Sequence, residues 1–478
     1  MTARFVASRT FDLADQLWFA ATSGDANPMH VDPLAARRTQ FGEPLVHGVH
    51  GLLWGINAAA ATGTKLSGFR GMSAQFANPI LLGDEVEAHV AVSDADVKIE
   101  LRIRGLRCTA IRLTRQTPRA LPDWKLVATS PSSRRLAPQE LDIEQMHGIE
   151  AALDYSAPGL AEAFPAAAQE FGAGVLEGLA ASTYIVGMEA PGLHSIYSKL
   201  TAALDPQPDL HRVEYRVANA DPRFRIADVL MRTPAMSARM NTFARVSPIA
   251  PASMADIRPL LRTGEFTGQR ALVIGGSRGL GAATAKLIAA GGGDVTITYA
   301  RGEAEAKEVA AEIQAAGGTC QVQCYDAFNA PSRQLDFALR RPNAIYYFAT
   351  STIWRRKTRA FEPSVLREFM QLHVEGFAAL AEEARLRTQG RLALFYPSST
   401  YAVSPPPDFG EYAAAKRAGE AIAENLAATL PDMSIVIERL PPIDTDQNAS
   451  VTATHTISPI EAMLPVVRRM QLILQPTT

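Results

Sequence analysis

The hydrophobic pattern of the first 128 residues predicts two helices followed by several strands. One apolar run at helical spacing begins near Asp12 or Asp15, either of which can cap a helix, and a second covers residues 48–61. Alternating apolar and polar residues then predict strands within 69–80, 84–95, 97–116 and 123–131. Helices followed by consecutive strands are typical of an α+β unit with an antiparallel sheet.

A second block, residues 129–250, repeats this order of elements without clear sequence identity to the first. An apolar run predicts a buried helix at 172–188, and later runs predict strands at 194–205, 211–221, 224–233 and 236–248. The block is either a second copy of the same kind of unit or an unrelated α+β spacer. Residues 251–268 have Pro, Ser and Gly near both ends and are predicted to be a linker.

From residue 269 to the end of the chain, predicted strands and helices alternate. Six short apolar runs predict strands at 271–276, 294–300, 321–326, 344–349, 391–399 and 434–440. Alternation at this spacing is typical of an α/β Rossmann domain with a parallel, doubly wound sheet. The sequence therefore predicts a multidomain protein with the divisions 1–128, 129–250, 251–268 and 269–478.

Composition narrows the class of protein. Of the 478 residues 47% are apolar and 20% are charged, and the formal net charge of −2 gives no global attraction to nucleic acid or membranes. No apolar run reaches the roughly 20 residues that span a bilayer, and the N-terminus lacks the apolar core of a signal peptide. Cys108, Cys320 and Cys324 do not make a disulfide framework. We expect a cytoplasmic protein that binds neither nucleic acid nor membrane.

Residues suited to acid–base chemistry cluster in SGDANPMHVD (23–32) and FGEPLVHG (41–48). Addition of water to a conjugated double bond needs a base for the water, an acid for the α-carbon and donors for the thioester oxygen. Pro28 prevents a regular helix between Asp25 and His30, so both side chains can turn into one cleft. The alternative is an Asx-turn beside a surface histidine.

These segments resemble the hydratase 2 motif of the MaoC-like, (R)-specific enoyl-CoA hydratases, and the resemblance extends through Phe76, Pro79 and GDEV at 83–86. The motif is specific because Asp, Asn, Pro and His stand at short, fixed spacings before His-Gly. The resemblance implies a hot-dog fold, in which an antiparallel sheet wraps a long helix, and it implies that Asp25 and His30 are the catalytic pair.

The segment after this pair adds a further candidate. Glycine permits close approach of a substrate, so the backbone N–H of Gly48 is a candidate oxyanion donor. His47 and His50 are interpreted as structural. Some members of the family carry a hydroxyl residue on the helix that follows, where this chain has Ile56 and Asn57, so we expect a supporting contact to be altered.

The second block has no Asp-x-Asn-Pro-x-His motif. Its single histidine in PGLHS, His194, has no acid in the same arrangement. Double hot-dog hydratases pair one catalytic repeat with one that has lost its site and makes room for the acyl tail. The second block resembles such a non-catalytic repeat.

The third block opens with a glycine-rich loop, LVIGGSRGLG (272–281), between an apolar strand and a helix. Glycines in this position allow a tight turn and let a pyrophosphate approach the helix N-terminus. We expect cofactor contacts in this loop from Gly275, Ser277, Arg278, Gly279, Leu280 and Gly281.

A second candidate site lies further along the chain. Tyr412 and Lys416 are spaced i,i+4 in YAAAK and share one helix face, where the lysine cation is expected to lower the pKa of the phenol. A phenol can protonate the oxygen on which charge builds when a ketone accepts a hydride. Ser399 ends the predicted strand RLALFYPSS, thirteen residues before Tyr412.

The glycine loop and these three residues together resemble the short-chain dehydrogenase/reductase family across residues 269–447. The resemblance implies that Lys416 also holds the nicotinamide ribose and that Ser399, in preference to Ser398, bonds the substrate oxygen. The further cofactor contacts that it implies are Asp326 at the adenine, Ile443 and Thr445 at the nicotinamide amide, and Ala349.

The preferred dinucleotide is indicated by the second predicted strand of this block, DVTITYAR. It lacks the terminal carboxylate with which NAD-specific members bind the adenosine ribose. Arg278 and Arg301 stand where a guanidinium can reach a 2′-phosphate, which predicts NADP(H) as the cofactor. Arg301 is otherwise an ordinary surface residue.

Several departures from the family pattern bear on activity more than on fold. The family's Asn-Asn-Ala-Gly is replaced by residues 347–350, Tyr-Phe-Ala-Thr, and the helix Asn that supports the lysine through water is replaced by His373. The Pro-Gly after the sixth strand is replaced by 440–442, Leu-Pro-Pro. The basic run at 355–359 is either a solvated loop or a site that attracts CoA phosphates or an acidic carrier protein.

The two implied activities share an intermediate, because reduction of a 3-ketoacyl thioester gives the 3-hydroxyacyl thioester that a hydratase dehydrates. We expect NADPH-dependent reduction coupled to reversible dehydration, on a CoA or acyl carrier protein thioester, in a homodimer. One alternative is hydration followed by dehydrogenation, as in β-oxidation. Another is that one domain, more readily the reductase, is a non-catalytic binding or dimerisation module.

Overall fold

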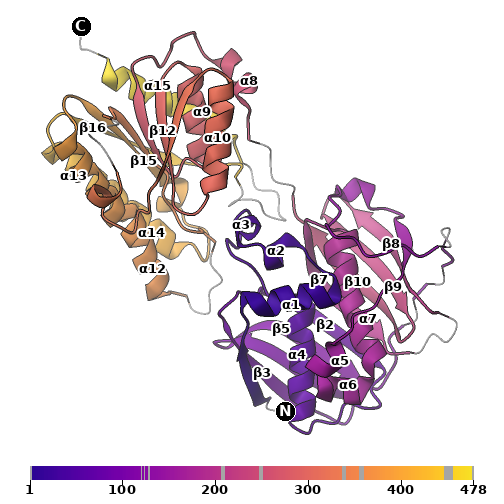
Figure 1. The fold of residues 1–478 in the computed structure, drawn as a ribbon. Helices are drawn as coiled ribbons and strands as arrows, with labels where there is room; N and C mark the ends of the chain where they lie inside the picture. Colours follow the sequence, from indigo (N-terminus) through magenta and orange to yellow (C-terminus); the bar gives the residue numbers. More distant parts are fainter. Residues whose placement is uncertain are drawn as a thin grey trace. The chain divides into compact units, whose positions relative to one another are not determined.

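The computed structural model describes residues 3–119, 121–122, 124–126, 130–205, 210–246, 251–335, 341–354, 360–445 and 456–475. They form two compact units, one made of the described residues up to 246 and the other of the described residues from 251 on. Figure 1 shows a sheet with helices over one face in the first unit, and a sheet between two layers of helices in the second. The basic run at 355–359 lies outside the described residues.

The first unit is built on one antiparallel sheet of ten strands, in the order β1-β3-β4-β5-β2-β7-β10-β9-β8-β6. The bounds of the strands are β1 (Arg4–Thr10), β2 (Gly71–Phe76), β3 (Glu85–Val92), β4 (Asp96–Ile103), β5 (Leu106–Thr114), β6 (Glu150–Leu153), β7 (Ser195–Ala203), β8 (Val213–Asp221), β9 (Ile226–Thr233) and β10 (Met236–Ala244).

This sheet consists of two five-stranded halves with the same topology. Counted from its outer edge, the first half runs β1-β3-β4-β5-β2 and the second runs β6-β8-β9-β10-β7, so each strand has a counterpart five places later. The halves meet where β2 pairs with β7, as in the pair Met72 and Ala202. The repeated order agrees with the pattern in the sequence, but the continuous sheet makes residues 1–247 one unit without a boundary near 128.

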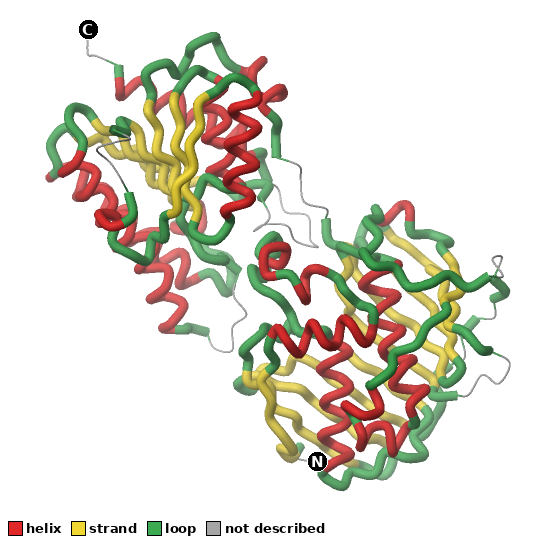
Figure 2. Tube along the Cα trace, in the orientation of Figure 1, coloured by secondary structure: helices red, strands yellow, loops and turns green. Residues whose placement is uncertain are grey.

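Each half packs an apolar helix against its strands, as the hot-dog fold requires (Figure 2). The helices are α1 (Leu13–Ser23), α2 (Pro28–Val31), α3 (Pro33–Ala36), α4 (Gly48–Ala61), η1 (Ile143–Gln145), α5 (Leu160–Ala163), α6 (Pro165–Phe171), α7 (Ala173–Tyr184) and the π-helical η2 (Ile185–Glu189). Glycine lets α4 approach the sheet closely, since a Cβ on Gly55 would lie 2.9 Å from Leu101 Cδ2. No single helix of the described residues is long and apolar enough to cross a membrane; one helix pair, α6 and α7–η2, passes on length and composition but is bent by 109° at the break between them.

The second unit contains a six-stranded parallel sheet in the order β13-β12-β11-β14-β15-β16. The bounds of the strands are β11 (Arg270–Ile274), β12 (Asp294–Tyr299), β13 (Thr319–Cys324), β14 (Ala344–Tyr347), β15 (Leu392–Ser399) and β16 (Met433–Leu440). All six lie on the runs that the sequence predicts. The strand order reverses between β11 and β14, which is where doubly wound sheets bind ligands.

Helices cover both faces of this sheet (Figure 1). Buried side chains of α9, α10 and α15 form one apolar cluster with the strands, and those of α13 and α14 form another. The bounds are α8 (Met254–Ile257), η3 (Arg258–Leu260), α9 (Gly279–Ala290), α10 (Glu303–Ala315), η4 (Pro331–Arg333), α12 (Pro363–Met370), the π-helical η5 (Gln371–Gly376), α13 (Phe377–Arg387), η6 (Thr400–Ala402), α14 (Gly410–Thr429) and α15 (Pro459–Leu474).

The prediction of a linker at 251–268 is wrong, because this segment is part of the second unit. Met254, Ile257 and Phe266 are buried in the cluster that contains α9. Lys286 on α9 donates to the carbonyl of Ala252 at 3.1 Å, which ties down the start of the segment. Its Pro, Ser and Gly residues lie in turns and helix caps between the buried side chains of Met254, Ile257 and Phe266.

Candidate active sites

The first candidate site begins where α1 ends. Gly24 caps α1 with φ of 78°, in the left-handed region that favours glycine, and turns the chain out of the helix before Asp25. Asn27 accepts a hydrogen bond from Met29 N at 3.2 Å, and Pro28 begins α2, which carries His30. The predicted break in the helix at Pro28 is confirmed, and it brings Asp25 and His30 together.

Asp25 is buried, with 1% of the residue exposed, and its carboxyl group has two hydrogen-bond donors. Thr183 Oγ1 donates to Oδ2 at 2.6 Å, and the backbone N–H of Asn27 donates to Oδ1 at 3.3 Å. Burial raises the pKa of Asp25 to about 7, although both hydrogen bonds act to lower it. Asp25 therefore exchanges a proton near neutral pH, which suits a general acid or base.

His30 is held as a neutral imidazole. Its Nδ1 lies 2.9 Å from the carbonyl oxygen of Leu45, an acceptor, so Nδ1 carries the hydrogen and Nε2 presents a lone pair. Burial lowers the pKa of His30 to about 4, and the charge of Arg245 also lowers it. At neutral pH His30 is therefore available to accept a proton.

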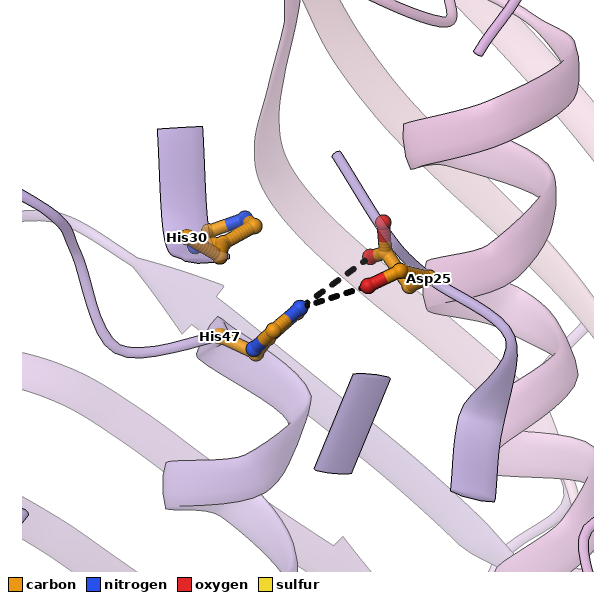
Figure 3. Close-up of side chains that lie close together, drawn as sticks. All are labelled: Asp25, His30 and His47. Atoms are coloured by element: carbon orange, nitrogen blue, oxygen red, sulfur yellow. Dashed lines mark hydrogen bonds and ion pairs between the residues drawn. The ribbon is translucent and has the colours of Figure 1, made fainter. Parts of the chain in front are cut away.

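His47 is also part of this site (Figure 3). Its Nε2 lies 2.9 Å from the backbone oxygen of Asp25 and 4.0 Å from Asp25 Oδ2, and its ring stacks on that of His30 with centroids 3.9 Å apart. Gln16 Oε1 faces its Nδ1 at 2.9 Å. His50 is further removed and stacks on Phe19 at 4.7 Å. His47 thus supports the loop that carries Asp25, and its position is more central than the sequence indicated.

Asp25, His30 and His47 bring three possible metal-ligating atoms within 4.8 Å of one another. The geometry does not fit a single ion well. The two imidazole planes are stacked at only 26°, so their lone pairs cannot converge on one point, and hydrogen bonds from Thr183 and Asn27 already engage the carboxylate. Acid–base chemistry fits this arrangement better than metal ligation.

Gly48 is the first residue of α4, so its backbone N–H has no acceptor within that helix. It follows His47 directly, which places this donor beside the acid–base pair. A Cβ at this position would lie 2.9 Å from the ring of Phe76, so only glycine fits without displacing the aromatic side chain. The placement supports the oxyanion role expected for Gly48.

A hydroxyl contact to the Asp25 carboxyl comes from the second half of the unit, and sequence reasoning missed it. Thr183 on α7 supplies it, while Ile56 on α4 is buried in the core. Asn57, the neighbouring position, instead caps α6 by accepting from Ala166 N at 3.0 Å. Nothing in the local pattern around Thr183 marks it, because its partner Asp25 is 158 residues away.

The second half has a buried acid of its own, Glu189 in η2, but this acid is fully engaged. Arg135 Nε and Gln139 Nε2 each donate to Oε2 at 2.9 Å, Tyr215 donates to the same oxygen at 3.1 Å, and Tyr184 donates to Oε1 at 2.8 Å. Four donors thus occupy the two carboxylate oxygens of Glu189. The arrangement fits a non-catalytic repeat that supports the site of its neighbour.

The glycine loop of the second unit has the geometry of a phosphate cradle. Gly275 and Gly279 have φ of 77° and 55°, and a Cβ on Gly281 would overlap the carbonyl of Gly275. Because α9 begins at Gly279, the N–H groups of its first turn have no acceptor within the helix. A Cβ on Gly279 would be in van der Waals contact with Thr445, so Thr445 lies next to this loop. These features fit the pyrophosphate of a dinucleotide.

The other expected cofactor positions surround this loop. Ala349 follows β14 beside Gly275, and Ile443 is buried near the end of β16. Asp326 caps a turn after β13 by accepting from Phe328 N at 3.0 Å. Arg301 is exposed after β12. The remaining loop positions all lie at the start of α9: Ser277 is buried, and Arg278 and Leu280 are half-buried.

Ser399, Tyr412 and Lys416 lie together at the carboxyl end of β15 and on α14. The side chain of Ser399 hydrogen-bonds the Tyr412 hydroxyl, whereas Ser398 donates to Glu420 Oε1 at 2.5 Å. This placement favours Ser399 over Ser398, as the resemblance implies. Lys416 Nζ donates to the carbonyl of Pro397 at 2.7 Å and lies 5.5 Å from the centre of the Tyr412 ring.

The pKa of Tyr412 departs from the sequence-based expectation. Burial raises it well above the ordinary value, only partly opposed by the hydrogen bond to Ser399. Burial also lowers the pKa of Lys416 to about 7, so the cation that was expected to acidify the phenol is itself destabilised. The phenol consequently holds its proton, as a proton donor must.

The departures from the family pattern are accommodated by packing. Tyr347 is buried, and its hydroxyl donates to the carbonyl of Leu372 in η5 at 2.7 Å. His373 is 1% exposed, stacks on Phe369 and meets the ring of Tyr412 edge-on at 5.7 Å. Neither substitution separates Ser399, Tyr412 and Lys416.

The fold defines a two-part protein with a hot-dog unit and a Rossmann unit, each of which contains one candidate site. The MaoC like domain family matches residues 1–105, and the short chain dehydrogenase family matches residues 269–456. The chain thus joins a MaoC-like domain to a short-chain dehydrogenase domain.

Relatives of the first domain include two CoA-dependent enzymes. The (R)-specific enoyl-CoA hydratase of Aeromonas caviae is 41% identical over 90 residues, 18% of this chain and 65% of that protein. The 3-hydroxybutyryl-CoA dehydratase of Methylorubrum extorquens is 33% identical over 110 residues, 22% of this chain and 66% of that protein. The chain spans just under two thirds of the length of each.

A solved structure similar to the second domain is a short chain dehydrogenase from Burkholderia cenocepacia in complex with NADP. It is 24% identical, has a TM-score of 0.39, and the match covers 42% of this chain and 90% of that one.

Proposed function

We propose that the first site catalyses the reversible addition of water to a 2-enoyl thioester. One observation carries the proposal: within 4.8 Å, a carboxyl group that holds a proton near neutral pH faces an imidazole whose Nδ1 hydrogen is fixed by Leu45. Such a pair offers one proton to give and one lone pair to receive a proton, which is what hydration requires.

In the hydration direction His30 Nε2 takes a proton from water, whose oxygen bonds to C3 of the substrate. The π electrons move toward the thioester carbonyl, where the Gly48 N–H bonds the oxygen as charge develops. Asp25 gives its proton to C2, and the imidazolium of His30 then returns a proton to the Asp25 carboxylate. Dehydration of a 3-hydroxyacyl thioester follows the same steps in reverse.

This assignment predicts the pH dependence of hydration. Activity should fall as Asp25 loses its proton above pH about 7 and as His30 gains one below about 4. Because the Thr183 hydrogen bond lowers the pKa of Asp25, Thr183→Val should raise that pKa and move the alkaline limb upward. The measurement is kcat/KM for crotonyl-CoA against pH, with Ser182→Ala on the same helix as the control. A rate that rises through pH 7 would make Asp25 the base and contradict the assignment.

For the second site we propose NADPH-dependent reduction of a 3-ketoacyl thioester. When bound, NADPH supplies the hydride to the carbonyl carbon. Ser399 orients the carbonyl oxygen, and Tyr412 donates the proton that completes the alcohol. The raised pKa of Tyr412 keeps the phenol protonated, which is the form that donates a proton in the reductive direction. We propose that Lys416 holds the cofactor ribose.

The choice of NADPH over NADH rests on Arg278 at the N-terminus of α9 and on the exposed Arg301. Charge-assisted bonds of about 1.5–3 kcal/mol correspond to roughly ten- to hundredfold preference. The double replacement Arg278→Ala, Arg301→Ala should raise the dissociation constant for NADPH by that factor and leave the constant for NADH nearly unchanged. Fluorescence titration with both cofactors measures this, and equal weakening of the two would reject the assignment.

Coupling of the two activities through a 3-hydroxyacyl thioester is proposed because both sites act on the same carbon. The alternative hypothesis is the oxidative direction, in which hydration is followed by dehydrogenation. Purified protein should hydrate crotonyl-CoA and, separately, reduce acetoacetyl-CoA with NADPH. Failure of one assay alone would support the alternative in which that domain is a non-catalytic module. A homodimer and a cytoplasmic location stay predictions.

A further inference from the structure

Arg245 is a buried cation beside the first site, and it takes no part in the mechanism proposed for that site. It follows the last residue of β10 and is 9% exposed. Its backbone N–H donates to the carbonyl of His194 at 2.8 Å, and its own carbonyl accepts from Arg225 Nη2 at 2.8 Å. Hydrogen bonds to its N–H and to its carbonyl therefore hold the backbone of Arg245 in place.

Within the described residues no carboxylate pairs with this guanidinium. Its Nη2 donates to the carbonyl of Leu193 at 3.1 Å, and its Nε is buried without an acceptor. Other arginines of the same half are paired: Arg135 with Glu189 at 2.9 Å, and Arg232 with Glu214 at 2.7 Å. A buried charge without a partner destabilises the folded state. The same loss of hydration lowers the pKa of Arg245 to about 10.

The guanidinium adjoins the catalytic loop. The carbonyl of Leu193 that it bonds also accepts from Asn27 Nδ2 at 3.4 Å, and Asn27 lies between Asp25 and His30 in the motif. The positive charge reaches the catalytic imidazole, because Arg245 lowers the pKa of His30. An anion bound to Arg245 would therefore lie close to the reacting carbons.

We propose that Arg245 binds a carboxylate carried by the acyl group, so that the first site takes thioesters of dicarboxylic acids. The inference rests on the hydratase function proposed above and specifies its substrate class. A guanidinium pairs with a carboxylate through two parallel hydrogen bonds, and Nε is one of the donors in that fork. The phosphates of CoA are a less suitable partner, because the whole pantetheine arm separates them from the thioester.

Two unreactive ligands of equal carbon number test the proposal directly. Succinyl-CoA and butyryl-CoA differ at the end of a four-carbon acyl group, where one has a carboxylate and the other a methyl. Isothermal titration of the full-length protein should show about ten- to hundredfold tighter binding of succinyl-CoA. Arg245→Gln should remove this preference and Arg245→Lys should retain part of it. The control is Arg239→Gln on β10, whose partner is Asp228 at 3.8 Å.

Equal binding of the two ligands by the wild-type protein would overturn the proposal without the use of any variant. So would equal weakening of both ligands by Arg245→Gln in a variant with an unchanged circular dichroism spectrum, since that would make Arg245 a positioning residue. Hydration of crotonyl-CoA is measured in parallel. If crotonyl-CoA is hydrated but no carboxylate preference exists, this inference alone fails. If no CoA ester is bound or hydrated, the proposed function fails with it.

Discussion

Asp25→Asn should lower the rate of hydration of a 2-enoyl thioester by about 10²–10⁴-fold, the contribution of one general acid or base. The amide has nearly the same size as the carboxyl, so the contacts with Thr183 and Asn27 are changed little in shape, but it has no proton to exchange near pH 7. His30→Ala should have an effect of similar size, because it removes the lone pair that receives the proton of water.

Steady-state hydration of crotonyl-CoA measures the loss, and the second domain supplies an internal control. Reduction of acetoacetyl-CoA by the same Asp25→Asn preparation should be unchanged, which shows that the protein is folded and counted correctly. Asp94→Asn, in the turn between β3 and β4, controls for the loss of one negative charge. Near-normal hydration by Asp25→Asn or His30→Ala would remove these residues from the mechanism.

Both candidate sites were predictable to the extent that their residues are local in sequence. Asp25 and His30 are brought together by a single proline-initiated turn, and Tyr412 and Lys416 by one helix turn. The glycine positions of the cofactor loop follow from backbone sterics that any such turn must obey. In each case a short-range rule fixes the geometry before any tertiary contact forms.

Contacts between distant segments could not be predicted in this way. Thr183 reaches Asp25 across 158 residues, and Arg245 reaches the loop of Asn27 only through the carbonyl of Leu193. Both come from the half of the unit that lacks the motif. The sequence predicted that this half is non-catalytic. It nevertheless contributes Thr183 and Arg245 to the surroundings of the site, and no sequence motif marks either residue.

Edge elements and burial account for the other differences. The edge strands β1 and β6 were not predicted from the hydrophobic pattern, because β1 is largely exposed and β6 has only four residues. The segment 251–268 has the composition of a linker, yet Phe266 is fully buried. The sign of the Tyr412 pKa shift depended on how deeply the phenol and Lys416 are buried, which spacing along a helix does not reveal.

Tyr412→Phe should lower ketone reduction by about 10²–10⁴-fold, because it removes the proton donor and leaves the ring in place. The ring packs against Phe369 at 5.4 Å and against His373, and these contacts do not involve the hydroxyl. The domain should therefore stay folded and bind NADPH with unchanged affinity. The measurement is oxidation of NADPH in the presence of acetoacetyl-CoA, together with a fluorescence titration of NADPH alone.

Tyr346→Phe is the matched control, since it also removes a buried phenol hydroxyl, one that lies 3.2 Å from Gln269 Oε1 in the sheet core. If both variants lose activity equally, the loss reflects packing of the domain and not proton donation. If Tyr412→Phe reduces acetoacetyl-CoA at the wild-type rate, the proton comes from another group and Tyr412 has no catalytic role. A selective loss in Tyr412→Phe, with NADPH bound and hydration intact, assigns the donor to this phenol and shows that the two sites act independently.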